Sequence, residues 1–195
     1  MKIDQIYTKC LSQASYFIEN NGEAAVIDPI REVNQYIEIA KSKKCKIKYV
    51  LQTHFHADFV SGHLTLSKLT GAPIVYGPNA DPQYDCIVSS EGDLFQIGNI
   101  KIEVLHTPGH TLESCSFLLY NENNEPHAIF TGDTLFLGDV GIPDVAQRYK
   151  NTTKEELAGI LYDSINSKIK PLSDDLVVYP GHGAGSACGK NMMKE

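Results

Sequence analysis

The sequence lacks several features that mark other classes of protein. No run of apolar residues approaches the ~20 that a membrane-spanning helix needs, and the first residues contain no apolar segment long enough for a signal peptide. The cysteines are odd in number and none shares a CxxC spacing, which argues against a disulfide framework and a structural zinc site: Cys10, Cys45, Cys86, Cys115 and Cys188. We therefore expect a cytoplasmic protein with reduced thiols and no membrane partner.

Positive charge is also scarce. The chain has 17 Lys and Arg against 24 Asp and Glu, which gives a formal net charge of −7. Proteins that bind nucleic acid cluster Lys and Arg against phosphates, so this balance argues against a nucleic-acid partner. We interpret the one basic run, from Lys41 to Lys48, as the solvated end of a helix.

The sequence predicts a single domain over residues 1–195, because no repeat, low-complexity segment or long linker divides the chain. Apolar segments between turn residues predict strands over residues 3–7, 15–19, 24–27, 47–52, 73–76, 100–105, 116–120, 128–130 and 176–179. Helical spacing predicts helices around residues 33–40, 64–70 and 153–168, the last with a capping box. This order indicates an α/β (α+β) architecture of two sheets packed face to face between helices.

Side chains that bind metals follow four of the predicted strands directly. His54, His56 and Asp58 follow one strand, and each of three others leads to a single residue: His110, Asp133 and His182. Glycine or proline turns the backbone after three of these strands, and rigid sheet ends can hold a metal tightly. Imidazole and carboxylate are ligands of zinc and non-heme iron. Four such strand ends predict a metal site; the alternative is a degenerate fold that keeps these residues for packing.

The chain resembles the metallo-β-lactamase superfamily in the order and content of these motifs. They span residues 53–182 and read Thr-His54-Phe-His56-Ala-Asp58, Thr107-Pro-Gly-His110, Phe130-Thr-Gly-Asp133 and Tyr179-Pro-Gly-His182. The resemblance implies an αββα sandwich of the metallo-β-lactamase type, with the metal at the sheet edges.

Phe59 departs from the pattern of the hydrolases in this superfamily. Their signature is H-x-H-x-D-H, and its last histidine serves a second metal, whereas a phenyl ring cannot ligate one. We therefore expect one metal per chain rather than a two-metal hydrolytic centre. Two histidines and one carboxylate leave three coordination positions open, which is typical of non-heme Fe(II) oxygenases.

Further motifs resemble the persulfide dioxygenases of the superfamily, especially bacterial members fused to rhodanese domains. They include Phe59-Val-Ser-Gly-His63, Gly138-Asp-Val-Gly-Ile142-Pro-Asp144 and Gly181-His-Gly-Ala-Gly-Ser-Ala-Cys188. The resemblance implies an Fe(II)-dependent dioxygenase that converts a low-molecular-weight thiol persulfide and O₂ to sulfite and thiol. The implied substrates are a persulfide and O₂. The implied protein partners are a second copy of the chain, in a homodimer, and a rhodanese domain in cis or trans.

The motif match also implies residue roles. The catalytic metal ligands are His54, His110 and Asp133, which would hold Fe(II), with zinc as the alternative metal on isolation. The residues that orient them are His56, Asp58, His182 and Tyr179. The substrate contacts are Phe59 and Ile142. Similar proteins carry an arginine at the position of Ile142.

The sequence is also compatible with two other functions. One is a glyoxalase II-like metal-dependent thioester hydrolase, and the other is a non-catalytic binding domain. We interpret Cys188 as a small buried hydrophobic residue rather than a reactive thiol. Similar proteins continue beyond the last motif, so we expect the chain to be truncated at its C-terminus.

Overall fold

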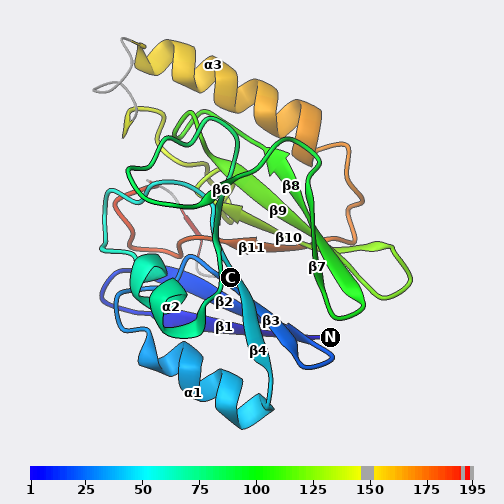
Figure 1. Cartoon of the computed structure of the whole chain (residues 1–195). Coiled ribbons are helices and arrows are strands. Elements are labelled where there is room, and N and C mark those ends of the chain that lie inside the picture. Colours follow the sequence, from blue (N-terminus) through cyan, green and yellow to red (C-terminus); the bar gives the residue numbers. More distant parts are fainter. Residues whose placement is uncertain (146–151, 190–191, 194–195) are drawn as a thin grey trace.

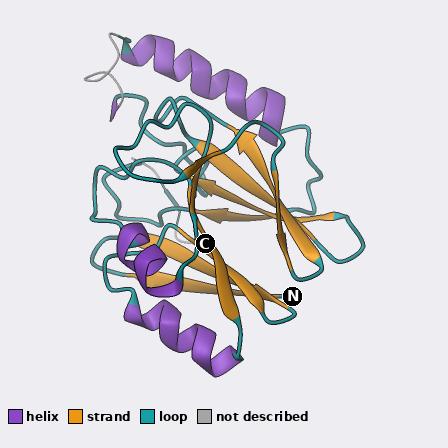
Figure 2. Ribbon diagram, in the orientation of Figure 1, coloured by secondary structure: helices purple, strands orange, loops and turns teal. Residues whose placement is uncertain are grey.

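The computed structural model describes residues 1–145, 152–189 and 192–193, and it has four layers. Two β-sheets pack face to face, and helices cover the outer face of each (Figure 1, Figure 2). Helices α1 (Asn34–Lys43) and α2 (His63–Thr70) cover the first sheet. Helix α3 (Lys154–Ser164), continued by the π-helical segment Ile165–Ile169, covers the second. The predicted αββα sandwich is confirmed.

The first sheet has the strand order β1-β2-β3-β4-β5-β6. Its strands are β1 (Lys2–Thr8), β2 (Gln13–Asn20), β3 (Glu23–Ile27), β4 (Lys46–Gln52), β5 (Ile74–Tyr76) and β6 (Ile87–Val88). A two-residue turn, Asn21-Gly22, joins β2 to β3 with positive φ at both positions, which suits the twist of a hairpin. From β3 onward the strands are parallel; α1 and α2 form the first two crossovers, and a loop over residues 77–86 joins β5 to β6.

The second sheet has the order β11-β10-β9-β8-β7. Its strands are β7 (Leu94–Ile97), β8 (Ile100–His106), β9 (Cys115–Tyr120), β10 (Pro126–Gly132) and β11 (Val177–Pro180). Strand β9 is antiparallel to both β8 and β10, and β10 is parallel to β11. Strands β8, β10 and β11 therefore point the same way, and their carboxyl ends meet at one edge of the sheet.

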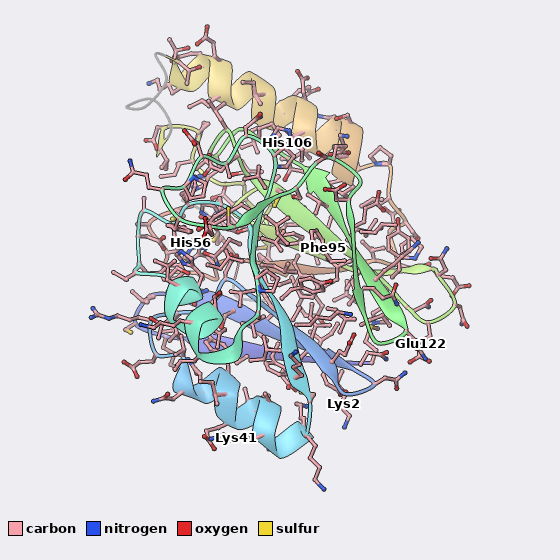
Figure 3. All side chains as sticks on the ribbon, viewed as in Figure 1. Lys2, Lys41, His56, Phe95, His106 and Glu122 are labelled. Carbon is pink, nitrogen blue, oxygen red and sulfur yellow. The ribbon has the colours of Figure 1, made fainter. Side chains whose placement is uncertain are left out.

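Apolar side chains fill the space between the sheets and the space beneath the helices (Figure 3). Between the sheets the core includes Tyr16, Phe117 and Phe130, which are almost fully buried. Beneath α1 and α2, Tyr36 and Leu66 are equally buried. Burial on both faces makes the sheets rigid, so the residues just beyond the strand ends are held in fixed positions. Among the described residues, no helix is long and apolar enough to span a membrane.

The sequence missed two short strands, β6 and β7. Strand β6 has only two residues, both exposed, and β7 has four residues of which only Phe95 and Ile97 are buried. Such short segments give no periodicity of their own; their partners in the sheet define them. The predicted helix to residue 168 is α3 followed by the π-helical segment, so its extent is confirmed and its last turn is wider than expected.

Candidate metal centre

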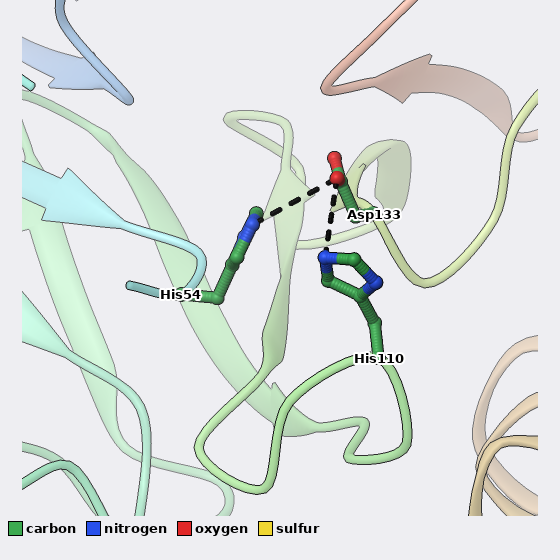
Figure 4. Close-up of side chains that lie close together, drawn as sticks. All are labelled: His54, His110 and Asp133. Atoms are coloured by element: carbon green, nitrogen blue, oxygen red, sulfur yellow. Dashed lines mark ion pairs between the residues drawn. The ribbon is translucent and has the colours of Figure 1, made fainter. Parts of the chain in front are cut away.

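Three buried side chains, His54, His110 and Asp133, meet where the strands of the two sheets end (Figure 4). His54 follows β4, His110 lies in the loop after β8, and Asp133 follows β10. The Nε2 atoms of His54 and His110 lie 3.8 and 3.4 Å from Oδ2 of Asp133. All three side chains are buried, so the polar atoms that face one another here are shielded from solvent.

A hydrogen-bond relay fixes the orientation of His54. The Thr53 hydroxyl donates its only hydrogen to Oδ2 of Asp28 at 2.7 Å, so it can only accept from the Nδ1–H of His54, 2.9 Å away. This places the ring proton on Nδ1 and leaves the Nε2 lone pair facing Asp133. Asp28 is itself held, because its Oδ1 accepts the Thr53 backbone N–H at 2.8 Å.

His110 has the same arrangement with a different partner. Its Nδ1 lies 2.8 Å from the carbonyl oxygen of Ile142, which can only accept, so Nδ1 carries the proton. The Nε2 lone pair of His110 therefore also faces Asp133. Burial, with repulsion from the neighbouring histidines His56, His110 and His182, holds the pKa of His54 well below its usual value. His54 is therefore a neutral ligand at physiological pH.

Asp133 completes a donor set that fits a cation. Both of its carboxylate oxygens are buried and have no hydrogen-bond partner among the described residues. A buried carboxylate facing imidazole lone pairs is strongly unfavourable unless a positive charge lies between them. Two imidazole nitrogens and a carboxylate are a ligand set for zinc or iron(II). The residues therefore fit the metal that the sequence predicted.

Glycines let the backbone approach Asp133 closely. A Cβ at Gly181 would lie 2.7 Å from Oδ1 of Asp133, and a Cβ at Gly141 would lie 2.0 Å from its carbonyl oxygen. Both distances are shorter than side chains tolerate, so only glycine fits at these two positions. Gly181, which follows a predicted strand, and Gly141 therefore allow the loops to close around the site.

The structure brings His182 and Asp58 beside the three buried ligands. Nε2 of His182 lies 3.2 Å from Oδ2 of Asp58 and 3.6 Å from Oδ1 of Asp133. Burial lowers the pKa of His182, but the Asp58 carboxylate, the Cys188 thiol and Asp133 outweigh it and raise the pKa to about 11. The two carboxylates therefore favour the charged form of His182.

The other expected site residues lie further out. His56 turns toward Asp28, with Nε2 3.1 Å from Oδ1, and its ring lies 4.3 Å from that of Phe59. Tyr179 stacks on Phe130 with ring centroids 5.1 Å apart, so its ring belongs to the core between the sheets. Ile142 touches the site through its main chain, which accepts the hydrogen bond from His110.

Sequence reasoning missed two supporting residues, Asp28 and Thr53. Asp28 is buried, follows β3 directly and has a φ of 48°, which is uncommon outside glycine. An aspartate at a strand end, followed by proline, was the available signal. Its partner Thr53 precedes His54, but only the fold shows that the two strand ends adjoin.

The comparisons with known proteins agree with this geometry. The family model described as the metallo-beta-lactamase superfamily matches residues 8–182. A probable hydroxyacylglutathione hydrolase of Schizosaccharomyces pombe is 35% identical over 168 residues, covering 84% of this chain and 60% of its own length. The chain thus spans only part of this relative.

Two solved structures are similar over nearly the whole chain. A metallo-beta-lactamase from Staphylococcus aureus has a TM-score of 0.87 and 40% identity, covering 97% of this chain and 58% of its own. The protein ETHE1 from Myxococcus xanthus has a TM-score of 0.81 and 30% identity, covering 97% of this chain and 79% of its own.

The relatives correct the expected activity. Those with 33–35% identity are hydroxyacylglutathione hydrolases, whereas the similar mammalian persulfide dioxygenases are 32% identical. The expectation of an Fe(II)-dependent persulfide dioxygenase is therefore wrong, and the thioester-hydrolase alternative fits better. The physical reason is that two histidines and one carboxylate serve oxygenases and hydrolases alike, so the ligand set alone does not identify the reaction.

The assignment to a family rests on the fold, on the buried ligands at the strand ends and on the family match over residues 8–182. From these observations we conclude that the chain belongs to the metallo-β-lactamase superfamily.

Proposed function

We propose that this chain is a metal-dependent hydrolase of thioesters formed by low-molecular-weight thiols. The observation that carries the proposal is the buried set His54, His110 and Asp133, whose lone pairs converge without hydrogen-bond partners for the carboxylate among the described residues. The similarity to hydroxyacylglutathione hydrolases supports a hydroxyacyl thioester of glutathione as the substrate class.

These three residues would hold one divalent ion, and zinc suits a hydrolysis that involves no redox step. Such an ion would supply Lewis-acid chemistry, making water more acidic and polarising a carbonyl group. The protein's contribution is to fix the ligands: Thr53 and the Ile142 carbonyl direct the two imidazoles, and burial keeps His54 neutral.

Asp58 is the proposed acceptor for the attacking water. Its side chain is 21% exposed, so it lies between the buried ligands and solvent. Burial raises its pKa, but the hydrogen bond and charge of His182 outweigh this and hold the pKa below the usual value. The carboxylate is therefore ionised at neutral pH and can accept a hydrogen bond that orients water.

The proposed substrate contacts are the side chains of Phe59 and Ile142, both partly exposed. Ile142 presents an apolar side chain while its backbone holds His110, so a substitution there alters the substrate surface without removing the carbonyl. The cytoplasmic location, the homodimer and the rhodanese partner stay predictions.

Metal dependence tests the proposal. The protein stripped with a chelator is assayed on thioesters of glutathione and of coenzyme A, before and after zinc or iron(II) is added back. We expect hydrolysis only with metal, and a preference for the glutathione thioester. Metal-loaded, folded protein that hydrolyses none of them would favour a non-catalytic binding domain.

A further inference from the structure

The two histidine ligands lie at the ends of different sheets (Figure 4), and the bonds described above orient each one separately. Thr53 directs His54 from the first sheet, whereas the Ile142 carbonyl directs His110 from the loop after β10. Neither bond fixes the distance between the two imidazoles, whose ring centroids lie 5.1 Å apart. Because metal ligands must be held to within about 0.5 Å of the required geometry, we looked for a link between the sheets beside His54.

Two hydrogen bonds make that link, one on each side of His54 in the chain. The Cys115 N–H at the start of β9 donates to the Thr53 carbonyl at 2.9 Å. The Phe55 N–H donates to Oε1 of Glu113 at 3.0 Å. The two segments are therefore joined at two points, and at one of them a carboxylate takes the place of a main-chain acceptor.

Glu113 lies three residues after His110 in a loop that is cross-linked internally. The Thr107 N–H donates to the Ser114 carbonyl at 2.9 Å, which closes the loop at its base. The hydroxyls of Thr111 and Ser114 lie 2.7 Å apart and form a further hydrogen bond within it. A displacement of Glu113 would therefore carry His110 with it.

Glu113 is buried although its side chain is polar. The residue is only 9% exposed, and the bond from Phe55 is the one hydrogen bond that its side chain makes within the described residues. Gly77, directly after β5, packs against its main chain, since a Cβ there would lie 2.7 Å from the Glu113 carbonyl oxygen. An apolar side chain of similar length would be buried here at lower cost, so the bond to Phe55 accounts for the carboxylate.

We propose that Glu113 is a positioning residue that sets the spacing of His54 and His110. It acts through the Phe55 N–H, because the reach of its side chain determines how closely the strand end that carries His54 approaches the loop that carries His110. A misplacement of about 1 Å can slow a reaction about 100-fold. This role rests on the proposed function in that the same metal centre would carry out the hydrolysis.

Two mild substitutions separate the reach of the side chain from its charge. Glu113→Asp keeps the carboxylate but is one methylene shorter, so it cannot hold the Phe55 N–H unless the loop moves. Glu113→Gln keeps the length and an acceptor oxygen but lacks the charge. The matched control is Glu23→Asp, because Oε2 of Glu23 accepts the Gly98 N–H at 2.8 Å, another bond between the sheets, at the start of β3 and away from the ligands.

Cobalt(II) added to the metal-free proteins reports on the site without reference to activity, since its visible absorption bands depend on ligand geometry. Glu113→Asp should bind cobalt about 10–100-fold more weakly than the wild type, with shifted bands. Glu113→Gln and Glu23→Asp should keep the affinity and the bands of the wild type. In hydrolysis of a glutathione thioester, Glu113→Asp should lower kcat more than it changes KM, because it displaces metal ligands rather than substrate contacts.

Hydrogen exchange of the Phe55 N–H, followed by NMR in the metal-free proteins, checks the bond itself. Exchange should be slow in the wild type and in Glu113→Gln, and faster in Glu113→Asp. Fast exchange in the wild type would overturn the proposal.

Three cobalt results would also overturn it: wild-type affinity and bands in Glu113→Asp, a loss in Glu113→Gln equal to that in Glu113→Asp, or an equal loss in Glu23→Asp. If the cobalt results are as expected but the wild type hydrolyses no thioester, the proposed function fails while the positioning role of Glu113 stands.

Discussion

At the scale of single residues, the position of one hydrogen decides whether each imidazole can bind a metal. Oxygen partners that can only accept, or whose own hydrogen is already donated, keep the proton on Nδ1 of His54, His110 and His182. Ligand-directing bonds of this kind typically contribute 10–100-fold to metal affinity. The residues that make them are therefore as testable as the ligands.

Thr53→Val removes the hydroxyl that directs His54 while keeping the shape of the side chain. We expect metal affinity to fall about 10–100-fold, because Nδ1 loses its acceptor and Asp28 loses a donor. Competition with a chromophoric chelator measures the change. Thr70→Val, which removes a hydroxyl that donates within α2, is the control and should leave affinity unchanged.

Ile142→Arg tests the proposed substrate contact at the same scale. A charge-assisted hydrogen bond contributes about 1.5–3 kcal/mol, so an arginine here should lower KM for an anionic thioester roughly 10-fold or more. The backbone carbonyl that holds His110 remains, so kcat should change less. Steady-state kinetics measure KM and kcat of this variant, with Ile142→Leu as the control. KM values that stay the same for several anionic thioesters would contradict the proposed contact.

At the scale of elements, α3 is coupled to the metal centre through the loop that carries His110. Gly109 has a φ of +139°, and a Cβ there would lie 2.3 Å from Cβ of Leu161 in α3. The Ser164 hydroxyl at the end of α3 donates to the Pro108 carbonyl at 2.7 Å. Helix α3 therefore packs directly against the backbone of this loop, and the absence of a side chain at Gly109 makes that contact sterically possible.

Gly109→Ala should displace this loop and lower both metal retention and the melting temperature. The cost combines a strained backbone with a clash against Leu161, so we expect a loss of about 1–3 kcal/mol of stability. Thermal unfolding and elemental analysis of the same preparation measure the two effects. Gly159→Ala, where a Cβ would meet nothing within 4 Å, is the control; equal results for the two variants would argue against the coupling.

The elements also show what the sequence could and could not predict. The candidate metal-binding residues were predictable because they lie just after strands with strong apolar patterning, such as β4 or β10, and the resemblance to the superfamily singled out three of them as ligands. The carbonyls of Ser12 and Ile142 were not, because main-chain acceptors leave no mark in a sequence. Cys188 is buried as expected, and burial raises the pKa of its thiol; only the fold shows that it lies beside His182.

At the scale of the whole molecule, the partly buried His63 makes stability depend on pH. Burial, and repulsion from His56, lower the pKa of His63 to about 4, and its Nε2 lies 2.8 Å from the Tyr84 hydroxyl. Between the ordinary pKa of 6.5 and 4, the unfolded chain binds a proton here that the folded protein does not. The contribution of His63 to the free energy of unfolding should therefore fall as the pH is lowered through this range.

His63→Asn should reduce that fall, because an amide can hydrogen-bond with Tyr84 without titrating. Urea denaturation of metal-free wild type and variant at pH 7 and pH 5 measures the difference. We expect the wild type to lose more stability than the variant, while other titrating groups cancel between the two. The same loss in both proteins would show that His63 does not carry this dependence.

The central claim is that the buried centre hydrolyses thioesters and needs no oxygen. The measurement is thiol release from a hydroxyacyl glutathione thioester by zinc-loaded protein in the strict absence of O₂, with Asp133→Asn as the inactive control. We predict release at the same rate with and without O₂, and loss of both activity and bound metal in the variant. Metal-loaded wild type that releases no thiol, yet consumes O₂ when given a glutathione persulfide, would contradict the account.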